Sequence, residues 1–334
     1  MTKKLELTKL YALTIGNAVV DTNIVSTTFN KHNLQQNLKH PIKNQTISIG
    51  GGALNAAATL TKLRFQTYPI CPVGNDHHGA FVSAQVKEKK METKALVQKS
   101  THSHQSTIIS VPDQEEPLVF SYKNPELFLA PKDIPATLIN QSSLLYIASF
   151  EPENIPAINT ALESAPKDCT IAFNPHPQMI EHKTAQFELF MEKSHIVFMN
   201  QYEAELYMKK KNEPWNLHTF FKLVCATKNK TIVLTLGRNG VHILHEGHLY
   251  SHPSITNSPI NTVGAGDAFN ACFSGLLTLG HDIKTAILYS LFNSGSVIKH
   301  HNTQTGILSI EELKTHSVSF EQLSAKAMRH NFIF

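Results

Sequence analysis

Hydrophobic positions along the chain fall into short runs, and polar stretches with helical propensity separate many of these runs. Runs of this kind, rich in β-branched and aromatic residues, are typical of buried β-strands. Apolar strands that alternate with helices indicate a parallel sheet covered by helices on both faces. We therefore predict strands at Tyr11–Ile15, Leu144–Ala148, Thr170–Phe173, His195–Met199 and Thr231–Leu236.

Apolar residues at helical spacing, among good helix formers, predict the helices. The clearest are Ala53–Leu63, His77–Lys90, Ala265–Leu279 and Ile283–His300. Two segments, about 24–49 and 100–125, interrupt the α/β rhythm, and within the second the pattern over 106–122 predicts a β-hairpin. We expect these segments to form a small second sheet. Because the chain has no internal repeat or linker, residues 1–334 are predicted to be a single α/β domain.

Composition narrows the classes of function. Hydrophobic residues make up 41% of the 334 residues and charged residues 17%, which is typical of a globular protein. No apolar stretch approaches the length of a membrane span. The net charge of +4 is small and dispersed, which argues against nucleic acid as a partner. The 4 cysteines form no CxxC pair, so reduced thiols and a cytoplasmic location are the simplest interpretation.

The 15 glycines are unevenly distributed: none lies within 80–236, and clusters occur at 50–52 and at 264 and 266. In the second cluster a loop enters a predicted amphipathic helix, where glycines let backbone N–H groups point at one spot and the helix dipole attracts negative charge. This arrangement predicts an anion hole. Asp267 lies in the first turn of that helix, where the dipole favours its ionised form. A carboxylate beside an anion hole can take a proton from a hydroxyl during phosphoryl transfer.

Three common glycine-containing motifs match this cluster less well. A helix cap accounts for glycine and aspartate at a helix start, but the ten-residue string 261–270 is more specific than a cap. A P-loop needs a lysine after the last glycine, and a dinucleotide-binding oxidoreductase needs a third glycine where Phe269 stands. Elsewhere, the spacing HxxHxxH of His242, His245 and His248 could suggest a metal, but the residues around it favour strand–turn–strand.

Five motifs, in order along the chain, resemble those of the PfkB (ribokinase-like) family of carbohydrate kinases. The string TVGAGDAFNACFSGLL over 262–277 resembles the family's DTxGAGD signature, and GGGALNAA over 50–57 resembles its GGxxxNxA signature. The segments GNAVVD at 16–21, NQYE at 200–203 and TLG at 235–237, with Gly240, resemble its GxxxxD, NxxE and TxGxxG motifs.

The resemblance implies a ribokinase-like three-layer α/β/α sandwich with a small β-sheet lid. It implies transfer of the γ-phosphoryl group of ATP, with Mg²⁺, to a hydroxymethyl group of a sugar. Asp267 would be the general base. The anion hole would be formed by Gly264, Ala265 and Gly266.

The same resemblance implies roles for the remaining motifs. Asp21 and Asn55 would bind acceptor hydroxyls, while Gly50 and Gly51 would let the backbone close on the substrate. On the nucleotide side Glu203 would act on Mg²⁺, directly or through water. The ATP site would be bordered by Asn200, Thr235, Gly237, Gly240 and Asn293. Family members often dimerise through the lid, so a homodimer is implied as well.

One departure concerns Asn261, which stands where DTxGAGD has aspartate. In many members that carboxylate helps to organise a monovalent cation, so activation by K⁺ is in doubt. The acceptor also stays open. An apolar wall at Val19 and Val20 would suit the base of a nucleoside, so an adenosine or nucleoside kinase is the alternative to a sugar kinase. A phosphorylated sugar is less favoured, although Lys123 keeps it open. A non-catalytic kinase-like binding protein would lack the base, which Asp267 supplies here.

Overall fold

The structure is a computed structural model that describes residues 10–26, 39–110, 117–225, 230–255, 259–315 and, as backbone, 328–331. Parts of the predicted lid segments, 27–38 and 111–116, lie outside the described residues. No helix among the residues that are described is both long enough and apolar enough to cross a membrane.

The larger sheet has nine strands within the described part of the chain, in the order β15-β14-β13-β12-β11-β10-β9-β1-β4. Six neighbouring strands run parallel, and these include all five strands that the hydrophobic runs predict. They are β1 (Tyr11–Ile15), β4 (Gln66–Ile70), β9 (Leu144–Ile147), β10 (Thr170–Phe173), β11 (Ile196–Asn200) and β12 (Thr231–Thr235). Antiparallel strands extend one edge: β13 (Val241–His245), β14 (His248–His252) and β15 (Met328–Asn331).

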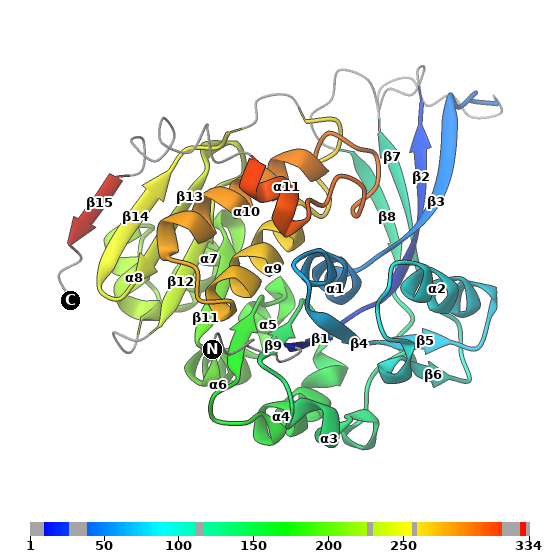
Figure 1. Ribbon diagram of the computed structural model, residues 1–334, viewed down its shortest axis with the longest axis horizontal. Coiled ribbons are helices and arrows are strands. Elements are labelled where there is room, and N and C mark those ends of the chain that lie inside the picture. The colour runs from blue at the N-terminus through cyan, green and yellow to red at the C-terminus, as the bar shows by residue number, and fades with distance from the viewer. Residues whose placement is uncertain are drawn as a thin grey trace, which may run out of the picture.

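Helices cover both faces of this sheet (Figure 1). Side chains alternate along each strand, so that Tyr146 packs into one core and Leu145 into the other. The first core is closed by α1 (Gly52–Lys62), α2 (His77–Glu88), α9 (Ala265–Thr278), α10 (Ile283–Val297) and α11 (Ile310–Thr315). The second is closed by α3 (Ala136–Ile139), α4 (Ile155–Ser164), α5 (Pro177–His182), α6 (Thr184–Lys193), α7 (Gln201–Lys210) and α8 (Leu217–Val224). The predicted three-layer α/β/α arrangement is therefore confirmed.

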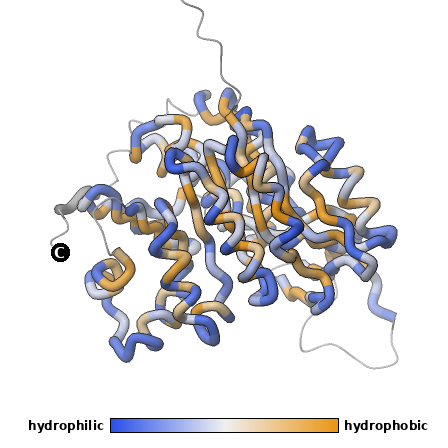
Figure 2. The backbone as a smooth tube through the Cα atoms, turned by 90° about the horizontal axis from the view of Figure 1, so that it is seen from below, coloured by the Kyte–Doolittle hydropathy of each residue, from blue (hydrophilic) through white to orange (hydrophobic). Residues whose placement is uncertain are grey.

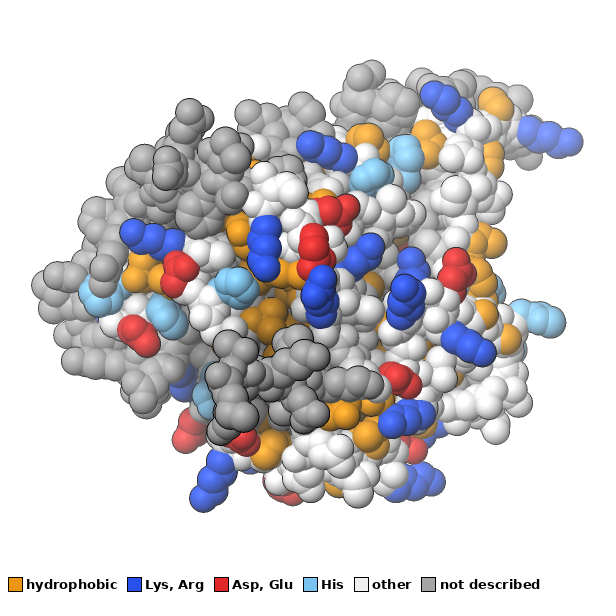
Figure 3. Space-filling view, viewed as in Figure 1, with side chains coloured by type: hydrophobic (Ala, Val, Ile, Leu, Met, Phe, Trp, Pro, Cys, Tyr) orange, Lys and Arg blue, Asp and Glu red, His pale blue; other side chains and the backbone are white. Residues whose placement is uncertain are grey.

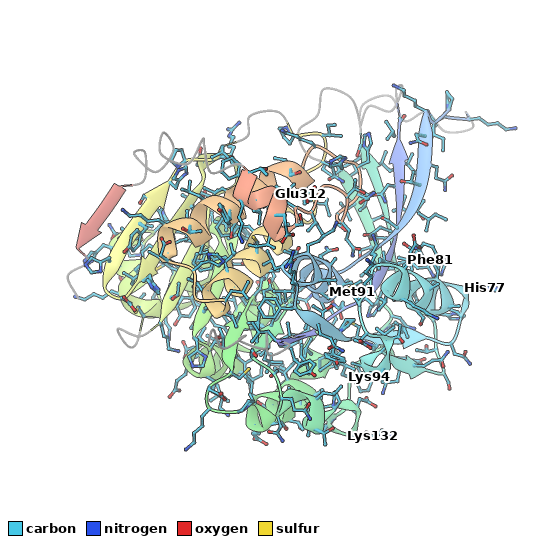
Figure 4. The ribbon with its side chains drawn as sticks, in the orientation of Figure 1. His77, Phe81, Met91, Lys94, Lys132 and Glu312 are labelled. Atoms are coloured by element: carbon cyan, nitrogen blue, oxygen red, sulfur yellow. The ribbon has the colours of Figure 1, made fainter. Side chains whose placement is uncertain are left out.

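The tube coloured by hydropathy shows the same layering, with hydrophobic stretches in the interior and hydrophilic positions at the outer turns (Figure 2). Met91 is buried in the first core, and Figure 4 places it between α1 and α2. The strand β5 (Pro72–Gly74) precedes α2 in the chain and β6 (Val97–Lys99) follows it. These two short strands pair in parallel with each other. On the face drawn in Figure 3, Lys and Arg side chains are interspersed with Asp and Glu.

A second sheet of four strands stands beside the main body, with the order β3-β2-β7-β8 (Figure 1). We call it the small sheet. Its strands β7 and β8 pair antiparallel, which confirms the hairpin predicted from 106–122. The strand β2 starts before the predicted segment, directly after the GNA turn. The four strands are β2 (Val19–Val25), β3 (Asn44–Gly50), β7 (His104–Ser110) and β8 (Leu118–Tyr122).

The two faces of the small sheet differ. Strand alternation places Asp21 and Ser106, which are paired across β2 and β7, on one face, and both are buried. We call this the inner face. The opposite, outer face carries apolar side chains that are exposed to solvent. Ile47 is 57% exposed and Phe120 61% exposed.

Candidate active site

The proposed base lies where α1 and α9 pack against each other (Figure 1). Asp267 is in the first turn of α9, and Asn55 is in the first turns of α1. The Asn55 amide Nδ2 donates a hydrogen bond of 2.9 Å to Asp267 Oδ2, across 212 residues of sequence. The two glycine-rich motifs therefore meet at a single hydrogen bond.

The electrostatics of Asp267 differ from what the helix dipole alone predicts. Burial of the carboxyl raises the pKa of Asp267, and the hydrogen bond from Asn55 lowers the pKa only in part. The sequence reveals the helix start but not the depth at which the side chain lies. The result is a carboxylate of raised basicity, which suits a general base.

Asn55 is held on its other side by the loop that follows α10. Its Oδ1 accepts hydrogen bonds from Thr303 Oγ1 at 2.9 Å and from Gln304 Nε2 at 3.1 Å. Asn55 is 3% exposed, and both lone pairs of its oxygen are used. Asn55 thus positions the carboxylate of Asp267. Thr303 and Gln304 belong to no motif, so sequence reasoning missed them.

The predicted anion hole forms the amino terminus of α9. Gly264 has φ of 81°, and a Cβ at this position would lie 2.7 Å from the Cβ of Thr303. A Cβ on Gly266 would meet no atom within 4 Å, so the space beside that backbone is open. The N–H of Ala265 is partly engaged by Thr262 O at 3.2 Å. An anion fits best against the open side of Gly266, where the helix dipole also favours it.

The first glycine cluster is shaped by its neighbours. A Cβ on Gly50 would lie 1.9 Å from Asp21 Oδ2, and Gly51 has φ of 91° with Asn17 O only 2.4 Å from the site of a Cβ. Any side chain at Gly50 would therefore displace the carboxylate of Asp21. These glycines bring the start of α1 close to β2 and to the turn that precedes it.

Asp21 projects from the inner face of the small sheet. Its Oδ1 accepts a hydrogen bond from the hydroxyl of Ser106. Burial is the main cause that raises the pKa of Asp21 to about 6; the hydrogen bond from Ser106 and the charge of Lys123 oppose this rise, and the charge of Asp267 adds a smaller part of it. The charge of Asp267 therefore reaches Asp21, which is consistent with their prediction as parts of one site.

The motifs predicted for the nucleotide lie side by side at the carboxyl ends of two parallel strands. Asn200 ends β11 and pairs in register with Thr235, which ends β12. Asn200 and Glu203 also form a capping box: Asn200 Oδ1 accepts from Glu203 N at 2.9 Å, and Asn200 N donates to Glu203 Oε2 at 2.8 Å. Burial raises the pKa of Glu203 to about 7, and the charge of Asp267 adds to this increase.

The other residues predicted to border the ATP site are two glycines in the turn after β12 and an asparagine on α10. Gly237 and Gly240 have φ of 56° and 93°, and a Cβ on Gly240 would lie 2.0 Å from His252 O, so this turn requires glycine. Asn293 is 1% exposed. Its Nδ2 donates to Ala268 O at 2.9 Å, and its Oδ1 accepts from Leu308 N at 2.9 Å. The side chain of Asn293 thus joins α10 to α9 and to the loop before α11.

With this geometry in place, comparison with known proteins gives the family. The sequence model of the pfkB family of carbohydrate kinases matches residues 10–310. The chain belongs to this family. Its resemblance to the family is therefore confirmed over most of its length, and it is a kinase that phosphorylates an alcohol group.

A curated relative in this family is the 5-dehydro-2-deoxygluconokinase of Shouchella clausii. It is 23% identical over 279 residues, which cover 80% of this chain and 85% of the relative. A crystal structure of a candidate ribokinase II from E. coli, in complex with ATP and Mg²⁺, matches with a TM-score of 0.77 and 15% identity, covering 94% of this chain and 99% of that one. A nucleoside kinase of Methanocaldococcus jannaschii matches with a TM-score of 0.74 and 17% identity, over 94% and 99% of the two chains. The ribokinase-like fold is thereby confirmed.

The pfkB kinases use a hard cation together with the nucleotide, and the donor set of this chain fits that use. Among the described residues, no three His, Cys, Asp or Glu side chains gather into a metal cage. Mg²⁺ bound with ATP needs only one or two carboxylates, because phosphates and water complete its shell. Burial is the main cause that raises the pKa of Glu203, and the charge of Asp267 contributes to the rise, so a cation near these two carboxyl groups would favour their ionised forms. His242 and His245 lie on β13, and their Nδ1 atoms pair with Ser251 and Thr231.

Proposed function

We propose that this pfkB kinase transfers the γ-phosphoryl group of ATP to a hydroxymethyl group of a sugar, with Asp267 as the general base. The observation that carries this proposal is the hydrogen bond between Asn55 and Asp267 beside the open amino terminus of α9. The acceptor hydroxyl gives its proton to Asp267 as its oxygen bonds to the γ-phosphorus. The bond from that phosphorus to the bridging oxygen breaks, ADP leaves with the electron pair, and Asp267 then releases its proton to solvent.

The anion hole of Gly264, Ala265 and Gly266 stabilises the charge on the transferred group, with Gly266 closest to it. On the acceptor side, Asp21 binds a hydroxyl, and Gly50 and Gly51 allow the close approach of α1 to β2. Asn55 has one amide hydrogen left after its bond to Asp267, so it can donate to the acceptor while it holds the base. The small sheet serves as the lid of a single kinase domain.

ATP lies along the carboxyl ends of β11 and β12, bordered by Asn200, Thr235, Gly237 and Gly240. Glu203 would act on Mg²⁺, directly or through water, with the oxygen that the capping box leaves available. Mg²⁺ supplies charge neutralisation for the phosphates. Asn293 contributes indirectly, by fixing α9 through its hydrogen bond to Ala268 O.

The chain works without a monovalent cation, and the contacts of Asn261 support this part of the proposal. Asn261 is 1% exposed. Its Oδ1 accepts from Val263 N at 3.0 Å, and its Nδ2 donates to His301 O at 2.8 Å. The amide therefore ties the anion-hole loop to the loop after α10 by two neutral hydrogen bonds, and its missing charge leaves less to attract K⁺.

A nucleoside is the second candidate acceptor, favoured by the likeness to the M. jannaschii nucleoside kinase. The contacts weaken the argument for an apolar wall at Val19 and Val20. Val20 is packed in the first core, and only Val19 shares the inner face with Asp21. We keep the sugar first. A non-catalytic binding protein is disfavoured because Asp267 and its hydrogen-bond partner are both in place.

Two further properties are proposed. The outer face of the small sheet, with Ile47 and Phe120 exposed, is suited to a second copy of the chain, which would make a homodimer. The four cysteines are buried and form no disulfide within the described part of the chain, which supports a cytoplasmic location with reduced thiols.

ADP release in the presence of Mg-ATP tests the function across sugars, sugar acids, phosphosugars and nucleosides. Because relatives are named 5-dehydro-2-deoxygluconokinase, 5-dehydro-2-deoxygluconate is the first acid to include. We expect Asp267→Asn to lower kcat by several orders of magnitude with an unchanged melting profile. Asp133→Asn, a change away from these motifs, is the control. A variant at Asp267 with near-normal kcat would refute the base assignment.

A further inference from the structure

One histidine on the inner face of the small sheet has no assigned role. His104 begins β7, opposite Val19 on β2, and precedes Ser106 by two residues. Because side chains two residues apart in a strand share a face, His104 lies on the same face as Ser106 and Asp21. It is 0% exposed. It therefore lies under the small sheet, beside the acceptor residues.

The hydrogen bonds of His104 define which nitrogen carries the proton. Its Nδ1 accepts from the backbone N–H of Asn124 at 3.0 Å, so the hydrogen resides on Nε2. Burial, aided by the charge of Lys123, lowers the pKa of His104 to about 4, and the ring is neutral near pH 7. Its Nε2 finds no hydrogen-bond partner among the described residues. A buried donor without a partner is unfavourable, which points to a ligand atom that accepts its hydrogen.

A lysine stands next to this histidine. Lys123 follows β8, and its charge acts on Asp21, His104 and also His176, which caps α5. Its Nζ lies 3.3 Å from Glu151 Oε1, and its side chain is 38% exposed. Lys123 and Glu151 both border a pocket of about 190 Å³. The Glu151 side chain is only 19% exposed, so Lys123 should keep this partner, which would otherwise be a buried carboxylate without a counter-charge. Because an ammonium has three N–H donors, Lys123 can bind a ligand oxygen while it stays paired with Glu151.

We propose that the acceptor carries a carbonyl or carboxylate oxygen away from its reacting hydroxymethyl group, and that His104 Nε2 and Lys123 Nζ bind that oxygen. The inference rests on the proposed kinase function and specifies its substrate class. Both groups only donate hydrogen bonds, so they match an oxygen that only accepts. Asp21, which only accepts when ionised, selects a hydroxyl nearby. The acceptor is thus a keto sugar or a sugar acid.

Four six-carbon compounds separate the possible sources of that oxygen. D-fructose has a ketone, D-gluconate a carboxylate, 2-keto-D-gluconate both, and D-glucitol neither. We expect kcat/KM of the native chain to be at least about tenfold higher for one of the first three than for D-glucitol. A preference for D-glucitol or for a nucleoside such as adenosine would overturn the inference.

Variants of His104 test whether its Nε2 donates a hydrogen bond to this oxygen. His104→Phe removes the donor, and His104→Gln keeps an N–H near Nε2. We expect His104→Phe to reduce the preference over D-glucitol by about tenfold or more at unchanged KM for ATP, and His104→Gln to retain part of it. His195→Phe is the matched control, because His195 Nδ1 also accepts a backbone N–H, that of Ile171. An equal loss on all four acceptors would mean that His104 is only structural.

Calorimetric binding of the same four compounds separates this inference from the kinase function. Binding that depends on His104, without ADP release, would retain the acceptor class and refute the kinase reaction. Turnover that does not depend on His104 would support the kinase reaction and refute the acceptor class. Lys123→Met assigns the source, since it should weaken D-gluconate but leave D-fructose nearly unchanged if the ammonium reads a carboxylate. If neither His104→Phe nor Lys123→Met weakens the binding of D-gluconate or D-fructose, the inference is overturned.

Discussion

The carboxyl group of Asp21 makes a prediction about stability in the absence of ligands. Asp21 is 5% exposed, and burial raises its pKa from 3.8 to about 6. The unfolded chain therefore ionises Asp21 at a pH where the folded chain still keeps the proton. Between pH 4 and 6 the folded state binds more protons than the unfolded state, so the free energy of unfolding falls as the pH rises.

The size of this loss follows from the shift. A difference of about two pKa units, at about 1.4 kcal/mol each, corresponds to about 3 kcal/mol, fully lost above pH 7. Asp21→Asn removes the titrating group but keeps an oxygen that can accept from Ser106. We therefore expect the variant to gain about 3 kcal/mol relative to the native chain between pH 4 and pH 7. Glu203 titrates in both proteins and cancels in this difference.

Urea unfolding of both proteins at several pH values, without nucleotide or acceptor, measures this gain. Asp76→Asn is the control of opposite sign. Burial would raise the pKa of Asp76, but hydrogen bonds from Ser103 and Gly79 outweigh it and lower that pKa to about 2. Its stabilisation is present above pH 4 and lost as the pH falls toward 2, so this variant should be destabilised at pH 7. A pH-independent difference between Asp21→Asn and the native chain would refute the reasoning.

Three other changes test separate parts of the site. Gly264→Ala should lower stability by about 2 kcal/mol or more and reduce kcat, since φ is 81° and the methyl would lie 2.7 Å from Thr303 Cβ; Gly280→Ala, at the same φ with no atom within 4 Å, isolates the backbone strain. Turnover should be equal in K⁺ and tetramethylammonium buffers, and Asn261→Asp should introduce a K⁺ dependence; a strong K⁺ requirement of the native chain would contradict the proposal. Phe120→Asp should convert a dimer to a monomer in sedimentation velocity, and a native chain that sediments as a monomer would exclude a dimer through the small sheet.

The main sheet was predictable because buried parallel strands leave a local signature. The run at Thr170–Phe173 is apolar after its first residue, and the strand occupies the same four residues. The hairpin of β7 and β8 was visible for a similar reason. The pairing of β2 with β7 was not, because it joins segments about 85 residues apart and depends on which strand edges are free.

The motifs predicted which residues gather at the site, but not what each one touches. Asn55 and Asp267 were both expected there, yet the support of Asn55 by Thr303 and Gln304 depends on a loop without any recognisable pattern. The raised pKa of Asp267 depends on burial, which a single sequence does not give. His104 was missed because one histidine at the start of a mostly polar strand has no motif, and its meaning comes only from the unpartnered Nε2.

The bond between Asn55 and Asp267 also constrains how the protein is made. Asn55 draws its other partners from positions 248 and 249 residues later in the chain, so it gains all of them only when Gln304 is available. Contacts of such sequence separation form late in folding. During synthesis, Asn55 therefore lacks these partners until nearly the whole chain has emerged. Premature termination before α9 would leave a partial sheet that binds neither substrate and exposes its first core to aggregation.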